Sequence, residues 1–260
     1  MVAFLFGLAI GSFLNVCIYR IPAGLSLVHP PSRCPACETP VRPVDNVPLL
    51  SFLLLKGKCR SCGAPISWRY PAVEALTGVV FVLLYARFGM SINALAGIFF
   101  ASVVIVVSFI DLDTERIPNK VILPAIAAGA ALIVPDFVGY KILPLVGGGA
   151  LHSIAGFFVG GGSLLIIALA APLFFKKDAM GGGDIKLAAF IGLFLGVYSL
   201  LALFFSFLIG AIAGVFLLAR GSRGRSDTIP FGPYLAIGAI IVTLGGPELW
   251  RFYLAASGLA

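Results

Sequence analysis

Long runs of uncharged, mostly apolar residues follow one another along this chain, separated by short groups of charged residues. A helix needs about 20 apolar residues to cross the ~30 Å hydrocarbon core of a membrane, and most of these runs approach or exceed that length. Each run is therefore expected to span a membrane. The expected single-helix spans are Ala3–Tyr19, a helix from about Pro71, Phe88–Ile110, a short helix at Val121–Pro135, Ala150–Phe175 and about Ile229–Gly246.

The run Leu187–Ala219 is too long for one ordinary crossing, so it forms either one overlong helix or a hairpin that turns near Gly196–Ser199. Basic residues favour the cytoplasmic side of a membrane. They lie on both flanks of this run, as Lys176, Lys177 and Lys186 before it and Arg220, Arg223 and Arg225 after it. An even number of crossings places both groups in the cytoplasm. We therefore expect a hairpin, about eight transmembrane helices in all, and both chain ends outside.

The composition agrees with an all-α polytopic membrane protein. Hydrophobic residues make up 60% of the chain and charged residues 11%, and the mean hydropathy is +1.08. These values exclude a water-soluble domain and a disordered chain. The net charge of +7 does not indicate nucleic acid, because the basic residues lie singly or in small groups between apolar runs. Membrane lipid is the expected environment.

One long polar segment, residues 21–70, interrupts the pattern and divides the chain into three expected parts. These are a first transmembrane helix at 1–20, a cytoplasmic loop domain at 21–70, and a membrane core of about seven helices at 71–260. The loop contains two Cys-x-x-Cys pairs, formed by Cys34, Cys37, Cys59 and Cys62. Four such thiolates can close a tetrahedral zinc site with no open position, so we expect a structural zinc ion. Two structural disulfides are the weaker alternative, because the cytoplasm is reducing, and free thiols are a further alternative.

Acidic residues are rare in the chain, and two of them stand out by their position. Asp111 ends an expected span, and Asp184 follows three glycines at Gly181, Gly182 and Gly183. The glycines would let another segment approach closely. Two adjoining carboxylates that share one proton can activate water, as in aspartic proteases, so we interpret the two acids as a catalytic pair.

Other charged residues allow more than one interpretation. Asp113, Glu115 and Asp178 are expected to anchor helix ends at the membrane surface. Lys186 and the three glycines are candidates for shaping the site or contacting substrate. Glu74, inside the second span, either meets a basic part of the substrate or pairs with Arg69.

The motifs together resemble the type IV prepilin peptidase family, which comprises bifunctional leader peptidases and N-methyltransferases. The resemblance is carried by the segment Gly11–Pro22, the two cysteine pairs, Asp111-x-Asp-x-x-x-Ile-Pro118, Gly181-Gly-Gly-Asp184-Ile-Lys-Leu187 and Pro230-Phe-Gly-Pro233. The Gly-x-Gly-Asp element is also similar to that of intramembrane aspartyl proteases.

The resemblance implies an aspartyl peptidase core in residues 71–260 with Asp111 and Asp184 as catalytic residues. It implies cleavage after a Gly of the basic leader of type IV prepilins or type II secretion pseudopilins. Methylation of the new N-terminus with S-adenosylmethionine, a bacterial inner-membrane location and an active site on the cytoplasmic face are implied as well. The sequence contains no recognisable S-adenosylmethionine fingerprint, so the residues that bind this cofactor stay unassigned.

An ion-coupled transporter and a zinc-organised membrane scaffold are the alternatives to an enzyme. An ion-coupled transporter would use membrane carboxylates as a proton relay near the bilayer midplane, whereas these acids lie at expected helix ends. A membrane scaffold organised by zinc would explain the cysteines but not the acids.

Overall fold

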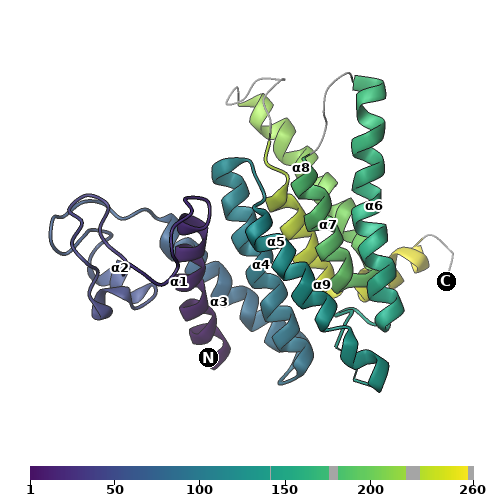
Figure 1. Cartoon of the computed structure of the whole chain (residues 1–260), viewed down its shortest axis with the longest axis horizontal. Helices are drawn as coiled ribbons and strands as arrows, with labels where there is room; N and C mark the ends of the chain where they lie inside the picture. The colour runs from purple at the N-terminus through teal and green to yellow at the C-terminus, as the bar shows by residue number, and fades with distance from the viewer. Residues whose placement is uncertain (141, 176–180, 221–228, 257–260) are drawn as a thin grey trace. The chain divides into compact units, whose positions relative to one another are not determined.

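The computed structural model describes the chain except for residues 141, 176–180, 221–228 and 257–260 (Figure 1). Helices account for all the regular structure in the described part, where only two isolated β-bridges occur besides. The chain divides into two compact units, Met1–Met90 and Ser91–Ala260. The all-α class expected from the sequence is confirmed.

The first unit consists of two long helices and the polar loop between them. Helix α1 spans Val2–Arg20 and helix α3 spans Arg69–Phe88, and the loop contains the short helices η1 (Pro43–Asn46) and α2 (Leu50–Leu54).

Glycines bring α1 and α3 into close contact. A Cβ atom added at Gly7 would lie 2.7 Å from the Gly78 Cα, and one added at Gly11 would lie 2.8 Å from the Glu74 Cα. Small residues allow such an approach between membrane helices, where the hydrophobic effect contributes little to helix association.

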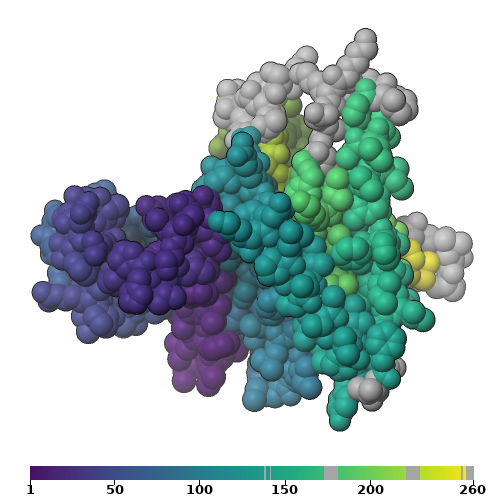
Figure 2. Space-filling view, in the orientation of Figure 1, coloured from purple at the N-terminus to yellow at the C-terminus, as the bar shows by residue number. Residues whose placement is uncertain are grey.

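The second unit contains the remaining long helices. They are α4 (Ile92–Thr114), α5 (Asn119–Ala131), α6 (Ala150–Phe175), α7 (Gly182–Leu195), α8 (Ser199–Ala219) and α9 (Gly232–Ala256), with the short helices η2 (Val134–Val138) and η3 (Gly196–Tyr198) between them. Helix α7 packs against α5, α6, α8 and α9, and little of it is seen between α5 and α6 in the space-filling view (Figure 2). Its side chains form the centre of this unit's core.

Aromatic rings and glycines determine how α7 packs. Phe190 and Phe194 are fully buried, and Phe100 of α4 stacks on both, with ring centroids 5.5 and 5.0 Å apart. On the opposite side, a Cβ atom at Gly156 of α6 would lie 2.2 Å from the Gly192 carbonyl oxygen. Helices α6 and α7 therefore pack backbone against backbone.

Seven helical stretches are long and apolar enough to cross a membrane, counted over the described residues. One of them, Gly182–Ala219, contains both α7 and α8. The chain turns between the two helices at η3, where Gly196 has a φ of +60°, and α8 runs back alongside the unit (Figure 1). The expected turn near Gly196–Ser199 is thus present. Of the basic residues used to predict it, Lys176, Lys177, Arg223 and Arg225 lie outside the described residues.

Two span boundaries differ from those expected. The third span begins at Ile92 rather than Phe88, because α3 continues to Phe88 and ends at Gly89, while the Ser91 hydroxyl accepts a hydrogen bond from the Ala94 N–H and caps α4. The last span continues beyond Gly246 to Phe252, and helix α9 to Ala256, through a kink at Gly245, whose φ and ψ are −147° and 15°. Hydropathy alone does not locate caps or kinks.

Candidate functional site

Asp111 lies in the last turn of α4 and is 4% exposed. Its Oδ2 atom accepts a hydrogen bond of 2.9 Å from the backbone N–H of Gly232, the first residue of α9. A Cβ atom at Gly232 would lie 2.8 Å from the same oxygen, so only glycine allows this approach without displacement. The Pro230-Phe-Gly-Pro233 motif therefore brings the start of α9 onto the Asp111 carboxylate.

Asp184 lies in the first turn of α7 and is half-buried. The glycines before it have distinct surroundings. A Cβ atom at Gly183 would lie 2.8 Å from the Ile117 Cβ in the connection between α4 and α5, whereas one at Gly182 would meet nothing within 4 Å. Gly183 therefore allows the start of α7 to pack closely on the segment that follows Asp111.

The two carboxylates are near enough for their negative charges to interact. They come from the end of α4 and the start of α7, which are more than 70 residues apart in the sequence. Asp111 is held by a backbone N–H, whereas Asp184 lies at the more accessible position. The structure thus brings together the two acids, Gly183 and the start of α9 at one end of the second unit.

Lys186 follows Asp184 by two residues, and its hydrogen-bond partner lies on α5. Its Nζ atom donates a hydrogen bond of 2.8 Å to Oδ1 of Asn119, the first residue of α5. This contact ties α7 to α5, and sequence analysis did not identify Asn119 as part of it. Asp113 and Glu115 are exposed at the end of α4.

The four loop cysteines form a compact cluster in the first unit. Their Sγ atoms all lie within 4.8 Å of one another, and all four are free thiols. The Cys34 and Cys62 sulfurs are 3.8 Å apart. Zn–S bonds of about 2.3 Å in a tetrahedron require sulfurs about 3.8 Å apart, so the cluster has the dimensions of a site for one tetrahedrally bound metal ion.

Two similar turns present these cysteines. In each turn the backbone carbonyl of the first Cys accepts a hydrogen bond from the backbone N–H of the residue after the second Cys. The Glu38 N–H donates to Cys34 at 2.8 Å, and the Gly63 N–H donates to Cys59 at 2.9 Å. The residue that donates has a positive φ in both turns, 56° at Glu38 and 73° at Gly63. An isolated antiparallel bridge closes each turn, Arg33 with Pro40 and Lys58 with Pro65. The repeated geometry aims all four sulfurs at one point.

Hydrogen bonds and neighbouring thiols shift the pKa values of three of these cysteines in different directions. Hydrogen bonds with the side chain and backbone of Thr39 lower the pKa of Cys37 to about 6. Backbone hydrogen bonds from Cys62 and Ser61 lower the pKa of Cys59. The backbone contact with Ala64 lowers the pKa of Cys62, but the neighbouring thiols and burial outweigh it and raise that pKa to about 12. Thiolates so close together repel one another, and a divalent cation would remove that repulsion.

Glu74 has a clear structural role within the first unit. It is 8% exposed, and its Oε2 atom accepts a hydrogen bond of 2.9 Å from the backbone N–H of Leu49, immediately before α2. The Ser12 hydroxyl of α1 also contacts this carboxylate. Glu74 therefore fastens the loop to the membrane helices. Sequence analysis considered a substrate contact or a pair with Arg69 and missed the Leu49 contact.

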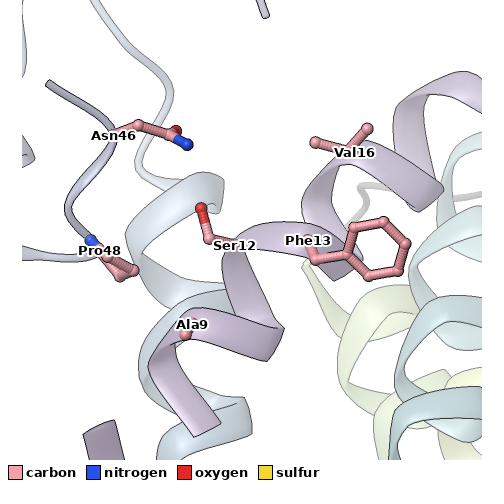
Figure 3. Close-up of a pocket in the computed structure, with 6 residues that line it drawn as sticks. All are labelled: Ala9, Ser12, Phe13, Val16, Asn46 and Pro48. Carbon is pink, nitrogen blue, oxygen red and sulfur yellow. The ribbon is translucent and has the colours of Figure 1, made fainter. Parts of the chain in front are cut away.

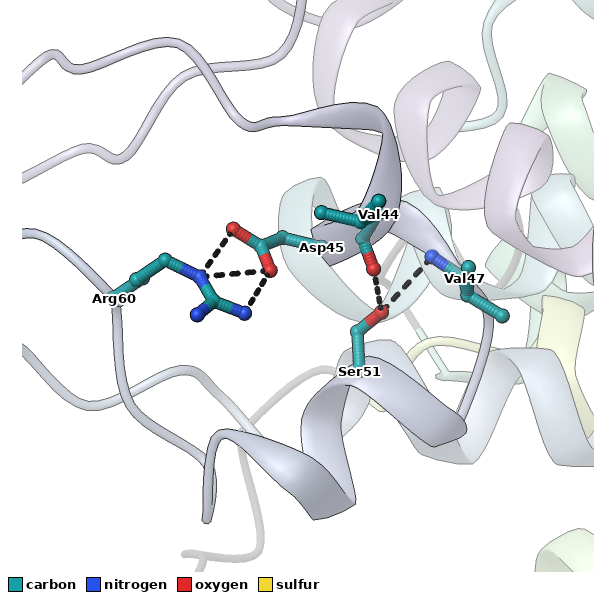
Figure 4. A network of polar contacts seen from close by, with 5 residues as sticks. All are labelled: Val44, Asp45, Val47, Ser51 and Arg60. Atoms are coloured by element: carbon teal, nitrogen blue, oxygen red, sulfur yellow. Dashed lines mark hydrogen bonds and ion pairs between the residues drawn. The ribbon is translucent and has the colours of Figure 1, made fainter.

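A chain of polar contacts continues from the start of α2 towards the cysteine cluster (Figure 4). The Ser51 hydroxyl donates to the Val44 carbonyl and accepts from the Val47 N–H, both at 3.0 Å. Arg60, inside the second cysteine pair, makes a two-pronged ion pair with Asp45 of η1, with a shortest distance of 2.7 Å. This pairing lowers the pKa of Asp45. The cysteine turns and α2 are thereby joined through η1.

A cavity of about 320 Å³ lies between α1 and the loop segment next to η1 (Figure 3). Its lining is mostly apolar and consists of Ala9, Ser12, Phe13, Val16, Asn46 and Pro48. Since Glu74 contacts both Ser12 and the residue after Pro48, it holds the two walls of this cavity together.

Comparison with known proteins covers most of the chain. Residues 5–88 match the model of the bacterial Peptidase A24 N-terminal domain, and residues 98–215 match that of the type IV leader peptidase family. Similar curated proteins bear the name prepilin leader peptidase/N-methyltransferase. That of Bacillus subtilis is 39% identical over 97% of both chains, that of Aeromonas salmonicida 38% over 97% of this chain and 92% of its own, and that of Neisseria gonorrhoeae 36% over 94% and 90%. No solved structure matches the chain.

Proposed function

Because the chain belongs to the type IV leader peptidase family, we propose that this multi-pass membrane enzyme cleaves the basic leader of prepilins or type II secretion pseudopilins after a Gly and then methylates the new N-terminus. The peptidase half is supported by the position of Asp111 at the end of α4 and Asp184 at the start of α7, near enough for their charges to interact. The substrate class and both reactions are supported by the similar proteins of Bacillus subtilis and Aeromonas salmonicida, which are named prepilin leader peptidase/N-methyltransferase.

The different surroundings of the two acids suggest a division of roles. Asp111 accepts the Gly232 N–H at the start of α9, where the helix dipole stabilises negative charge. We assign Asp111 as the ionised carboxylate that takes a proton from the attacking water. Asp184, in the more accessible position, carries the shared proton and donates it to the carbonyl oxygen of the scissile bond. The water oxygen bonds to the carbonyl carbon, and the C–N bond then breaks as the amine leaves with a proton.

The remaining parts support this chemistry indirectly. The four-cysteine cluster would hold a structural zinc ion, which would cross-link a loop that has little core of its own. S-adenosylmethionine would supply the activated methyl group, and the terminal amine of the cleaved substrate would attack it after losing its proton. We place the enzyme in a bacterial inner membrane with the acids at the cytoplasmic face, because most Lys and Arg residues lie in segments assigned to that side.

Mass spectrometry of the products tests both activities at once. The purified enzyme is incubated with a prepilin and S-adenosylmethionine. The expected product has lost the leader at the Gly bond and gained one methyl group on its new N-terminus. An intact prepilin recovered from enzyme that binds zinc and is folded would contradict the proposal.

A further inference from the structure

Helix α2 is folded with its polar side chain inside and its three leucine side chains outside. Ser51 is 7% exposed, and its hydroxyl is fully engaged with Val44 and Val47. Leu50, Leu53 and Leu54 are 53%, 66% and 72% exposed. Residues three and four positions apart share a helix face, so these leucines form one apolar surface, here called the α2 leucine face. A loop helix surrounded by water would instead bury its leucines and expose its serine.

Glu74 attaches the start of α2 to the membrane helix α3. Glu74 binds the backbone N–H of Leu49, next to α2, and lies five residues into α3, which begins at Arg69. At 1.5 Å per residue, this places the contact about 7.5 Å along a membrane helix. Amphipathic helices that lie in a membrane surface bury their apolar face about 5–10 Å into the boundary of headgroups and acyl chains. With Arg69 taken as the membrane surface, the start of α2 lies at the depth of that boundary.

The charges and rings around α2 fit the same location. Exposed Lys56 and Lys58 follow the helix directly, and residues 21–70 contain six basic residues against two acidic ones. Trp68, just before α3, is 74% exposed and packs edge-on against Phe52 of α2, with ring centroids 4.7 Å apart. Trp favours the membrane interface, and lysines near the surface are attracted to anionic headgroups.

We propose that the loop of the first unit is a membrane-interface module that binds anionic phospholipid. The α2 leucine face enters the upper acyl region, Trp68 lies at the headgroup level, and Lys56 and Lys58 contact lipid phosphates. Lipid contact by this loop does not depend on which reaction the enzyme catalyses.

A single-tryptophan experiment tests the contact directly. Trp68→Phe and Trp250→Phe remove both native tryptophans, and Leu53→Trp places a reporter on the leucine face. The protein is reconstituted into vesicles of phosphatidylcholine and phosphatidylglycerol whose acyl chains are brominated near the headgroup. We expect the emission of Leu53→Trp to fall by about half relative to unbrominated vesicles, as for a side chain at that depth. Zinc content confirms that the loop is folded.

Ser61→Trp in the same background is the matched control, because Ser61 is exposed on the second cysteine turn. It should respond to aqueous acrylamide rather than to brominated lipid. Quenching of Leu53→Trp by acrylamide alone would place α2 in water and overturn the proposal. Protection from both quenchers would mean that protein covers the leucine face and would overturn it equally.

The lipid preference has its own measurement. Quenching of Leu53→Trp by brominated lipid should be stronger in vesicles with phosphatidylglycerol than in pure phosphatidylcholine, and it should weaken as salt is added. Lys56→Gln with Lys58→Gln should remove most of that difference. Equal quenching in both vesicles with the lysines intact would overturn the assignment of anionic lipid as the partner.

Discussion

At the scale of single residues, the two acids of the second unit differ in how their negative charge is stabilised. Asp111 faces the start of another helix and accepts a backbone hydrogen bond, while Asp184 lies in the first turn of its own helix. Two like charges that interact cannot both be present cheaply, and the proposed mechanism therefore gives the two acids one proton to share. A substitution that preserves shape but removes the acid tests this arrangement.

Asp111→Asn and Asp184→Asn should each abolish leader cleavage. An amide can neither take a proton from water nor donate one as an acid does, and removing one member of a catalytic unit costs about 10⁴-fold or more. Methylation of a pilin that is supplied already cleaved should persist, because methyl transfer needs no carboxylate pair. Cleavage rates and methyl incorporation are measured on the same preparations. Near-normal cleavage by either variant would refute the pair, and lost methylation in folded protein would show that both reactions share these acids.

Gly232→Ala should reduce cleavage by about 100-fold, because the new Cβ would lie 2.8 Å from the Asp111 oxygen and displace it. Gly162→Ala is the matched control, since a Cβ there meets nothing within 4 Å in a helix of the same unit. Leader cleavage is measured for both at equal amounts of folded enzyme. If Gly232→Ala retained the control's activity, the close approach of α9 to Asp111 would be unimportant for catalysis.

At the scale of secondary-structure elements, one hydrogen bond and one short turn determine how segments of the chain are connected to the long apolar helices. The Glu74 contact with Leu49 attaches the loop to α3, and the turn at η3 reverses the chain between α7 and α8. Both features involve few residues, so each can be altered without disturbing the long helices.

Glu74→Leu should release the segment around η1 and α2 from the membrane helices. It leaves the Leu49 N–H without its acceptor, which costs about 1–3 kcal/mol, and it removes the contact with Ser12. Glu74→Gln is the conservative variant, because its amide oxygen can still accept the hydrogen bond. Limited proteolysis of residues 43–55 should become faster in Glu74→Leu and change little in Glu74→Gln. If the unmodified protein, Glu74→Leu and Glu74→Gln were cleaved equally slowly in this segment, the contact would not hold the loop.

The turn between α7 and α8 predicts the location of two fusion points. A reporter domain fused after Ser199 should lie outside the cytoplasm, and one fused after Arg220 should lie inside, because the two helices cross in opposite directions. Activity of a compartment-specific reporter measures each location. A reporter after Arg220 that is found outside would mean that the whole segment crosses once.

At the scale of the whole molecule, the chain consists of two units, and the cysteine cluster belongs to only one of them. Zinc bound by four thiolates contributes folding free energy to the segment that it cross-links. Its removal should therefore affect the first unit's loop and not the packed centre of the second unit.

The purified protein should contain about one zinc ion per chain, as elemental analysis can determine. Cys59→Ser or a strong chelator should lower this content and increase hydrogen exchange in residues 21–70. Protection of α7 should stay unchanged, because its core is formed by residues of the second unit. Zinc-free wild-type protein with four reactive thiols, or equal loss of protection in both units, would contradict this prediction.

The sequence by itself determined the helical class, most of the spans and the cysteine cluster. A membrane requires that backbone polar groups be satisfied within each segment, so length and apolarity predict helices directly. The spacing within Cys34-x-x-Cys37 and Cys59-x-x-Cys62 similarly predicts a tetrahedral site, because each pair is bound by its own local turn. These are properties of residues that are near one another in the chain.

Only the tertiary structure decided which distant segments meet. The contact of Asp111 with Gly232 joins residues 121 apart, that of Lys186 with Asn119 joins residues 67 apart, and that of Glu74 with Leu49 joins residues 25 apart. No periodicity in the sequence encodes such pairs, since they follow from how glycine and aromatic surfaces pack the helices together. The sequence did not predict that the α2 leucines are exposed. Hydropathy measures how apolar a segment is, whereas packing determines which side of the segment is covered.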